Sequence, residues 1–358
     1  MSNVDGCRVS EEIVGRRTRA VVLENDLLRT VVLADKGADI YELVYKPANL
    51  DVLFKTPWGF HDLGSLGATA SNSQVACIDH YGGGWQEIFP NFGSACEYEG
   101  LEWSFHGEVS TAGWDYRIIE NNNRRASVRF EINLSRTPFH LERTMTVEAG
   151  RPDLIVQERL TNTGEGETPY MWGHHPAFGA PFLGPECWID VPASTYKVMI
   201  PQTTPERTWM PAEGEWAWPH VAGLDGQSHD MRRIPGPESK VNTLGFATGL
   251  EEGWYGLTNQ KLGMGVGFAW PKELFPYLWI WQELNSTPGY PWYGRAYVTG
   301  LEFHSSVPGD GLLKALEAGT ERRIAAGESL DVEFRCMFYE STSGVDLIKP
   351  DGTVVVRT

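Results

Sequence analysis

The most constraining feature of this chain is a repeated alternation of apolar and polar residues in short segments separated by turn residues. Residues 127–134, 140–147 and 154–160 follow this pattern, and residues 330–339 repeat it near the end of the chain. Successive side chains of a β-strand point to opposite faces, so a period of two predicts strands with one apolar and one wetter face. Antiparallel sheets bury such strands on one side only. The sequence therefore predicts an all-β protein.

The remaining segments extend this interpretation. Residues 19–23 and 28–33 predict two strands joined by a short turn, and residues 40–45 continue the pattern. Only residues 310–317 have the composition of a helix. No repeat of fixed period and no low-complexity tract interrupts the chain, so the fold is expected to consist almost entirely of antiparallel sheet.

The length of the chain leaves two domain arrangements open. Its 358 residues would suit two average domains, but large all-β folds often exceed about 250 residues as one unit. Residues 201–237 are rich in Pro and Trp, and a linker is one interpretation of them. Trp209, Trp216 and Trp218 favour instead a long loop that packs on the body. We therefore predict a single domain over residues 1–358, with a core at about 18–340.

The chain is strongly acidic, with 47 Asp and Glu against 30 Lys and Arg and a formal net charge of −17. This charge argues against nucleic acid and anionic membranes as partners. No apolar run approaches the ~18 residues of a membrane span, and the first residues lack the pattern of a signal peptide. The five cysteines are widely spaced without a CxxC pair, so neither disulfides nor structural zinc are predicted. We expect a reduced, cytoplasmic protein.

Two adjacent histidines, His174 and His175, stand out in the segment 172–179. Imidazole titrates near neutral pH and can both accept and donate a proton. Pro176 restricts His175 to an extended or turn conformation, which suits the end of a strand. Adjacent strand residues face opposite sides, so only one of the two histidines can face a given pocket. The alternative is a pair of structural histidines bonded to backbone carbonyls.

Glu302 lies far along the chain in a predicted strand at 297–303. If it faces the interior, desolvation raises the pKa of its carboxyl group, which suits a general base. A Glu and a His brought together from distant segments move protons near neutral pH without a metal or cofactor. The alternative is a solvated glutamate on the wet face of a sheet. No metal site is predicted, because His304, close to Glu302, lacks a third ligand at a recognisable spacing.

Aromatic residues beside amides and an arginine suggest a sugar pocket. Trp281 and Gln282 lie in one such group, and Arg295 lies in a second group that follows it. Aromatic rings stack on the apolar faces of sugars, while amide and guanidinium groups bind hydroxyls. His106, between aromatic residues and a glycine, could donate to a substrate oxygen or be an ordinary loop histidine. Most tryptophans in proteins are core residues, which is the alternative for these groups.

Several motifs follow one another along the chain: residues 28–32 and 36–43, residues 143–147, residues 159–164, the His-Pro-x-Phe segment at 175–178, and Gly300-Leu301-Glu302. Taken in this order, they resemble the aldose 1-epimerase (galactose mutarotase) superfamily over about residues 18–340. Their order is a stronger signal than any one of them. The resemblance implies a large antiparallel β-sandwich, the galactose mutarotase-like supersandwich, with the site on a concave sheet face.

The resemblance also implies roles for individual residues. His175 matches the general acid that protonates the ring oxygen, and Glu302 matches the general base that takes the anomeric proton. His106 matches a second histidine that polarises the ring oxygen. We expect further substrate contacts from a set of six residues: Asn91, His174, Trp281, Gln282, Arg295 and His304.

The sequence thus predicts an isomerase, a mutarotase that interconverts the α and β anomers of an aldose by acid–base ring opening and closing, without a cofactor. Its partner is a small sugar, and a homodimer is left open. One alternative is a non-catalytic sugar-binding protein on the same scaffold. Another is a glycoside-cleaving enzyme on a related β-sandwich, which needs two carboxylates across a cleft. Glu302 with Glu283 or Glu87 would supply them. The motifs do not identify the sugar, and no basic cluster indicates a phosphate.

Overall fold

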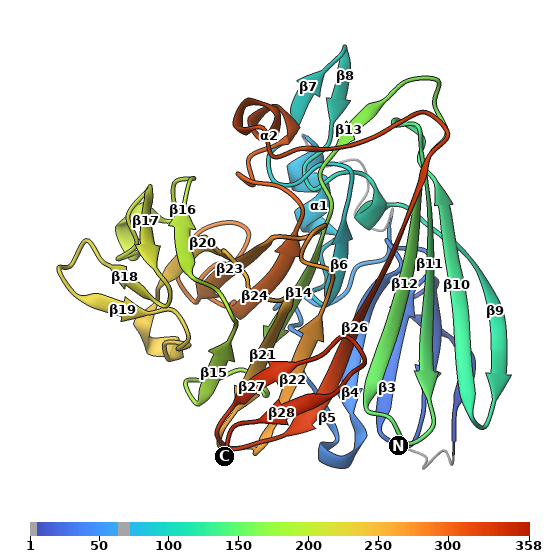
Figure 1. Ribbon diagram of the computed structural model, residues 1–358, viewed down its shortest axis with the longest axis horizontal. Coiled ribbons are helices and arrows are strands. Elements are labelled where there is room, and N and C mark those ends of the chain that lie inside the picture. The colour runs from blue at the N-terminus through green and yellow to red at the C-terminus, as the bar shows by residue number, and fades with distance from the viewer. Residues whose placement is uncertain (1–5, 64–71) are drawn as a thin grey trace.

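Two large antiparallel sheets make up most of the molecule in the computed structural model, which describes residues 6–63 and 72–358. The sheets lie against each other as two curved layers, and β9–β12 with β26 form the layer drawn on the right of Figure 1. One large apolar cluster contains residues from both sheets and is the main core. The all-β sandwich predicted from the alternating segments is therefore confirmed.

The first sheet carries the site described below. In the described part of the chain it has 12 strands in the order β1-β2-β3-β4-β6-β14-β24-β23-β20-β16-β17, with β5 paired to β4. These strands are β1 (Arg8–Val14), β2 (Thr18–Glu24), β3 (Leu28–Leu33), β4 (Asp39–Tyr45), β5 (Leu50–Asp51), β6 (Trp85–Ile88), β14 (Gly173–Gly179), β16 (Thr195–Val198), β17 (Gly214–Ala217), β20 (Asn242–Thr248), β23 (Tyr277–Leu284) and β24 (Tyr297–His304).

The second sheet backs the first. Within residues 6–63 and 72–358 it has eight strands in the order β15-β21-β22-β26-β12-β11-β10-β9. These strands are β9 (Asp115–Asn122), β10 (Arg125–Asn133), β11 (Phe139–Glu148), β12 (Asp153–Asn162), β15 (Cys187–Asp190), β21 (Trp254–Asn259), β22 (Met264–Ala269) and β26 (Ser329–Glu340).

Smaller elements close the ends and edges. Four two-stranded pairs are β7 (Cys96–Tyr98) with β8 (Leu101–Trp103), β13 (Thr168–Tyr170) with β25 (Arg322–Ile324), β18 (His220–Ala222) with β19 (Ser228–Asp230), and β27 (Val345–Ile348) with β28 (Val354–Val356). The helices are α1 (Ser73–Asp79), α2 (Leu312–Ala318) and the short 3-10 turns η1 (Lys46–Ala48), η2 (Val109–Thr111), η3 (Pro205–Arg207) and η4 (Pro237–Ser239). No helix of the described residues has the length and apolar character to cross a membrane.

The predicted strands agree closely with the structure, while the helices agree less well. The alternating segment at 140–147 forms the centre of β11, and the segment at 154–160 forms the centre of β12. The helix expected at 310–317 begins only at Leu312. Helix α1 was not predicted, although Asn72 marks its start by accepting a hydrogen bond from the Val75 N–H at 2.9 Å. Such a cap precedes many helices, but a seven-residue helix has too little periodicity to be recognised in sequence.

The Pro- and Trp-rich residues 201–237 form short strands and loops. Trp209, Trp216 and Trp218 are partly buried and pack against the main core, which agrees with the interpretation as a packed loop.

Strand register aligns one row of side chains across four neighbouring strands of the first sheet. Gln86 on β6 pairs with His175 on β14, and Glu302 on β24 pairs with Trp279 on β23. The antiparallel pairing of Gly173 with His304 carries on along β14 and β24, so His175 lies directly across from Glu302. Side chains in such a row point to the same face of the sheet.

Candidate active site

A cavity of about 470 Å³ opens on the face of the first sheet that points away from the second sheet. All four members of the cross-strand row line it: Gln86, His175, Glu302 and Trp279. Pairing register therefore collects polar groups from positions far apart in the sequence at the floor of one hollow. This is the usual arrangement of a small-molecule site, with a few polar groups on a largely apolar wall.

His175 and Glu302 contact each other at the floor. Nε2 of His175 lies 3.2 Å from Oε1 of Glu302, and the two side chains are only 10% and 3% exposed. Burial raises the pKa of Glu302 well above its ordinary value and lowers the pKa of His175 to about 4. Both shifts disfavour the charged form of the group. The pair is therefore held near neutrality, with one proton to share between the carboxyl group and Nε2.

His106 reaches the same cavity from the loop after β8. The Gly93 N–H donates to Nδ1 of His106 at 3.2 Å, so the neutral ring carries its proton on Nε2. Burial, helped by the nearby His175, lowers the pKa of His106 to about 3. The ring is thus neutral at neutral pH and offers an N–H donor 6.1 Å, between ring centroids, from His175.

His304 lies behind Glu302 and does not line the cavity. Its Nε2 is 3.6 Å from Oε2 of Glu302, so the carboxyl group has an imidazole at each oxygen. The ring occupies space left by Gly173, where an added Cβ would lie 2.0 Å from Nδ1 of His304. The ring of Phe92 stacks on that of His304, with 3.9 Å between the ring centroids. The substrate contact expected of His304 is therefore corrected to a contact with Glu302.

His174 is also corrected, because it faces the core between the sheets. Its Nε2 lies 3.2 Å from Oε2 of Glu158 on β12, and the Trp85 Nε1–H donates to its Nδ1 at 3.3 Å. The side chain is 1% exposed. With both ring nitrogens engaged on the far side of β14, His174 cannot contact a sugar in the cavity. The expectation that only one of the two histidines faces the pocket is confirmed, and that histidine is His175.

Asn91 is fully buried and uses its whole amide to join loops. Its Nδ2 donates to the carbonyls of Ser94 and Ser104 at 2.9 and 2.8 Å, and its Oδ1 accepts from the Leu312 N–H at 2.7 Å. A sugar contact is therefore replaced by a supporting role. Asn91 ties the loop at Ser94 to the segment just before His106 and to the start of α2.

The three remaining candidates divide between the two faces of β23 and its neighbouring loop. Trp281 lines the cavity, with its ring centroid 5.5 Å from that of His175. Gln282 points to the opposite face, where it accepts from the Thr243 hydroxyl at 3.1 Å. Arg295 is exposed and lies outside the cavity lining. Alternation along the strand accounts for the correction of Gln282, since adjacent residues cannot share a face.

Gln86 and Tyr81 are among the polar residues of the cavity that sequence reasoning missed. Both lie in or beside the Gly-rich segment 81–93, where glycines permit close backbone approach to a ligand. Tyr81 is 4% exposed and its ring contacts His175 edge-on at 6.1 Å between centroids. The only signal for Gln86 was its place in a strand next to the histidine strand, and that pairing is not visible in a single sequence.

The cavity is poor in positive charge. Among the described residues that line it, the acidic residues are Glu302 and Asp310, and no lysine or arginine is present. Asp310 lies at the rim, where its Oδ1 accepts from the Ser94 hydroxyl at 2.5 Å. An anionic ligand would thus find no cation to neutralise it.

Comparison with known proteins places the chain in a family. A family model described as a domain of unknown function, DUF4432, matches residues 15–337. This chain belongs to the DUF4432 family. No curated protein matches it by sequence.

Solved structures show the fold that this DUF4432 protein shares. A candidate aldose 1-epimerase from Klebsiella pneumoniae superimposes with a TM-score of 0.71 at 12% identity, covering 93% of this chain and 84% of the other. A galactose mutarotase-like protein from Clostridium acetobutylicum superimposes with a TM-score of 0.62 at 12% identity, covering 94% of this chain and 100% of the other. A candidate aldose 1-epimerase from Escherichia coli K12 superimposes with a TM-score of 0.60 at 17% identity, covering 89% of this chain and 98% of the other. At these identities the similarity establishes the galactose mutarotase-like fold.

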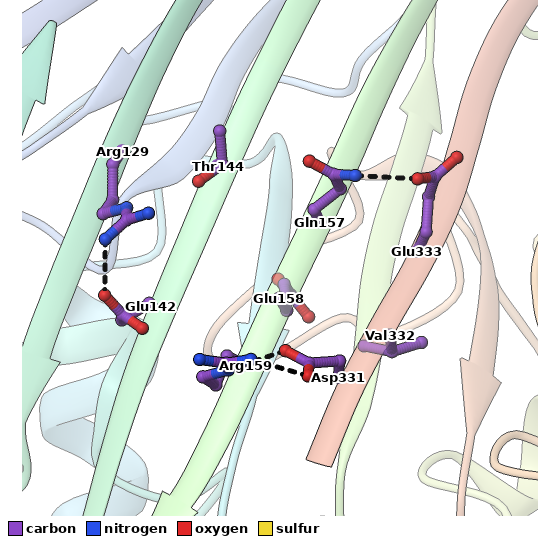
Figure 2. Close-up of a pocket in the computed structure, with 9 residues that line it drawn as sticks. All are labelled: Arg129, Glu142, Thr144, Gln157, Glu158, Arg159, Asp331, Val332 and Glu333. Atoms are coloured by element: carbon purple, nitrogen blue, oxygen red, sulfur yellow. Dashed lines mark hydrogen bonds and ion pairs between the residues drawn. The ribbon is translucent and has the colours of Figure 1, made fainter. Parts of the chain in front are cut away.

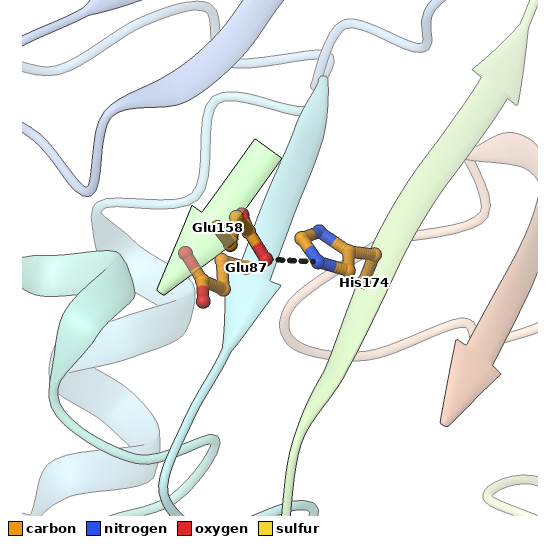
Figure 3. A group of neighbouring side chains, drawn as sticks. All are labelled: Glu87, Glu158 and His174. Carbon is orange, nitrogen blue, oxygen red and sulfur yellow. Dashed lines mark hydrogen bonds and ion pairs between the residues drawn. The ribbon is translucent and has the colours of Figure 1, made fainter. Parts of the chain in front are cut away.

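A second His–Glu cluster of the DUF4432 protein lies in the core. Glu87, Glu158 and His174 converge there with ligand atoms within 4.8 Å of one another, and Figure 3 shows His174 pointing at the two carboxylates. Arg143 already supplies a cation to this cluster: its Nε bonds Oε1 of Glu158 at 2.7 Å, and its other arm contacts Glu87. Trp172 donates to Glu87 at 2.7 Å. The guanidinium takes the place that a metal ion would need, so we assign the cluster a structural role.

The outer face of the second sheet has a hollow of about 480 Å³, shown in Figure 2. Its polar side chains pair with one another across the strands. The dashed contacts in Figure 2 are Arg129 with Glu142 at 2.8 Å, Arg159 with Asp331 at 2.7 Å, and Gln157 with Glu333 at 2.9 Å. Paired surface charges of this kind are ordinary on a solvated sheet. The cavity around His175 is therefore the stronger candidate site of the DUF4432 protein.

Proposed function

We propose that this DUF4432 protein is a mutarotase, which interconverts the α and β anomers of an aldose by opening and closing the sugar ring. The observation that carries the proposal is the contact of His175 with Glu302 at the floor of the cavity, 3.2 Å apart. Mutarotation needs an acid at one oxygen and a base at another, and it needs no net gain or loss of protons. A buried His–Glu pair that shares one proton meets both requirements.

The pKa shifts favour a particular starting state. Because burial raises the pKa of Glu302 and lowers that of His175 to about 4, the shared proton in the empty site resides on Glu302. Glu302 then begins as the acid and His175 as the base. This exchanges the roles that the resemblance implies for the first half of the reaction, while the same two residues carry it out.

The proton balance closes over a full cycle. His175 removes the anomeric hydroxyl proton while Glu302 protonates the ring oxygen, so that the bond from C1 to the ring oxygen breaks and the C1 carbonyl forms. Rotation about the C1–C2 bond turns the other carbonyl face toward the ring hydroxyl. Glu302 then takes back its proton as the ring closes, and His175 returns its proton to the former carbonyl oxygen. His106 supplies a fixed N–H donor to a sugar oxygen beside the pair.

We further propose that the substrate is an uncharged aldose. A phosphate or carboxylate on the sugar would enter a cavity that, in the described part of the chain, is lined by no lysine or arginine. An uncompensated buried charge is costly. We therefore expect the 6-phosphate of a good substrate to react with a much lower kcat/KM than the free sugar.

The glycoside-cleaving alternative lacks support from the two carboxylates that sequence reasoning offered. Glu87 faces the core, where it contacts Arg143. Glu283 is bound by the Ser286 and Thr287 backbone N–H groups at 2.6 and 2.9 Å and does not line the cavity. Neither can act with Glu302 across a cleft. A sugar-binding protein without chemistry would use the same cavity, and activity separates it from a mutarotase.

The test is anomeric exchange by NMR on a panel of free aldoses. Exchange that falls by about 10²-fold or more in Glu302→Gln would support the proposal, because general acid–base catalysis typically contributes that much. Glu317→Gln, on the surface of α2, is the matched control and should keep full activity. Exchange that persists in Glu302→Gln, or no exchange on any aldose despite binding, would overturn the proposal.

A further inference from the structure

Gln86 is held in one orientation beside the acid–base pair. It is 3% exposed, lines the cavity and lies across from His175 in the pairing of β6 with β14. Its Nε2 donates to Oδ2 of Asp39 at 3.0 Å. Asp39 in turn forms a buried ion pair with Lys36, and both side chains are at most 2% exposed. A buried chain of three residues therefore ends at the amide of Gln86.

The direction of this amide follows from the chemistry of its partner. A carboxylate accepts hydrogen bonds and cannot donate them, so the NH₂ end of Gln86 must face Asp39. The ion pair with Lys36 supports the charged form of Asp39, because the ammonium opposes the larger effect of burial, which raises the pKa of Asp39. The carbonyl Oε1 of Gln86 accepts no hydrogen bond from the described residues. It is thus the free end of an amide whose other end is fixed.

We propose that Oε1 of Gln86 is a specificity-determining acceptor, which binds one hydroxyl of the sugar next to the reacting centre. The Lys36–Asp39 pair is its positioning support, since a free amide could rotate and offer a donor instead. The site then selects an aldose that carries a hydroxyl at that position and rejects the deoxy sugar. It also disfavours a carboxylate there, because two acceptors would face each other. The inference rests on the proposed function for its activity readout.

The experiment uses the best aldose substrate and its set of single-deoxy analogues, with the wild-type protein and Gln86→Met. Wild-type protein should lose about tenfold in kcat/KM with one analogue, a typical cost of one neutral hydrogen bond. The kcat/KM of Gln86→Met should be about tenfold lower than that of the wild type with the parent sugar. With that same analogue, Gln86→Met and the wild type should have equal kcat/KM. Gln282→Met is the matched control, since Gln282 is equally buried in the same sheet but faces away from the cavity.

A double variant tests the support. Lys36→Met with Asp39→Asn removes both charges together, because removing one alone would leave a buried unpaired charge. Discrimination against the same analogue should shrink, while exchange still depends on Glu302. The inference would be overturned if Gln86→Met lowered kcat/KM equally for the parent sugar and for every deoxy analogue. It would also be overturned if both variants kept the wild-type ratio of kcat/KM between the parent sugar and that analogue. Sugar-induced quenching of tryptophan fluorescence gives the same comparison as binding constants, so the inference can be tested even if the protein catalyses no exchange.

Discussion

Two His–Glu clusters lie on opposite faces of the first sheet, around β6 and β14, and they differ in charge. On β6 and β14, Gln86 and His175 face the cavity, while the next residues, Glu87 and His174, face the core. The core cluster includes Arg143, which bonds both carboxylates. The cavity cluster has no cation among its described members. Each cluster contains a histidine and a glutamate, and the arginine counter-ion is what separates the core cluster from the cluster at the cavity.

The difference extends to unpaired atoms. In the core cluster, both ring nitrogens of His174 have partners. At the cavity, Nδ1 of His175 and Nε2 of His304 have no hydrogen-bond partner among the described residues. Buried polar groups are normally satisfied, and exceptions often mark functional positions. The two clusters therefore differ more in whether their polar atoms have hydrogen-bond partners than in their composition.

The sharpest test compares the adjacent histidines. His175→Asn should lower the rate of anomeric exchange by about 10²- to 10⁴-fold, because it removes a proton-transfer group. Its melting temperature should change little. Exchange kinetics by NMR and thermal unfolding by circular dichroism measure the two effects. A loss of stability with retained exchange would contradict the assignment of His175 to the reaction.

Arg143→Met tests the core cluster. Removing the guanidinium leaves two buried carboxylates without their cation, so we expect the free energy of unfolding to fall by about 3–5 kcal/mol. Urea unfolding at neutral pH measures this loss. A variant as stable as the wild type would show that the arginine is not needed to neutralise Glu87 and Glu158, and it would reopen the cluster as a metal site.

His174→Asn should give a smaller effect, opposite in kind to that of His175→Asn. It leaves the Trp85 N–H and Glu158 without one partner each, which costs about 1–3 kcal/mol of stability. Exchange per folded molecule should be unchanged. A large loss of exchange with normal stability would place His174 in the reaction and would contradict the separation of the two faces.

The pH dependence gives the mildest test. Activity requires neutral His175, whose pKa is lowered from 6.5 to about 4, so exchange should persist below pH 6 and fall as the pH drops through about 4. Stability falls over a related range. His106 and His175 have lower pKa values in the folded state than in the unfolded state. As the pH drops below 6.5, the unfolded state therefore binds protons first, and the free energy of unfolding decreases. Circular dichroism at each pH separates the two effects.

The contact pair of the candidate site could be predicted, but its surroundings could not. His175 and Glu302 stood out because their types and motif order carry chemistry, and the structure brings them together. Asn91 and Gln282 are amides of the kind that bind sugars, yet the first joins loops and the second faces away. Gln86 has the same chemistry and lines the cavity without any local signal. An amide reveals its role only through its neighbours, which a single sequence does not show.

Alternation along the chain determined the strands, the all-β class and the rule that His174 and His175 face opposite sides, because all of these follow from the period of a strand. The tertiary structure alone decided which side is which. The second sheet packs against the face of β14 that bears His174 and supplies Glu158 to it. The other face is left open, and pairing of β14 with β24 then places Glu302 against His175. Packing and register are long-range properties, so they belong to the fold and not to any segment of the sequence.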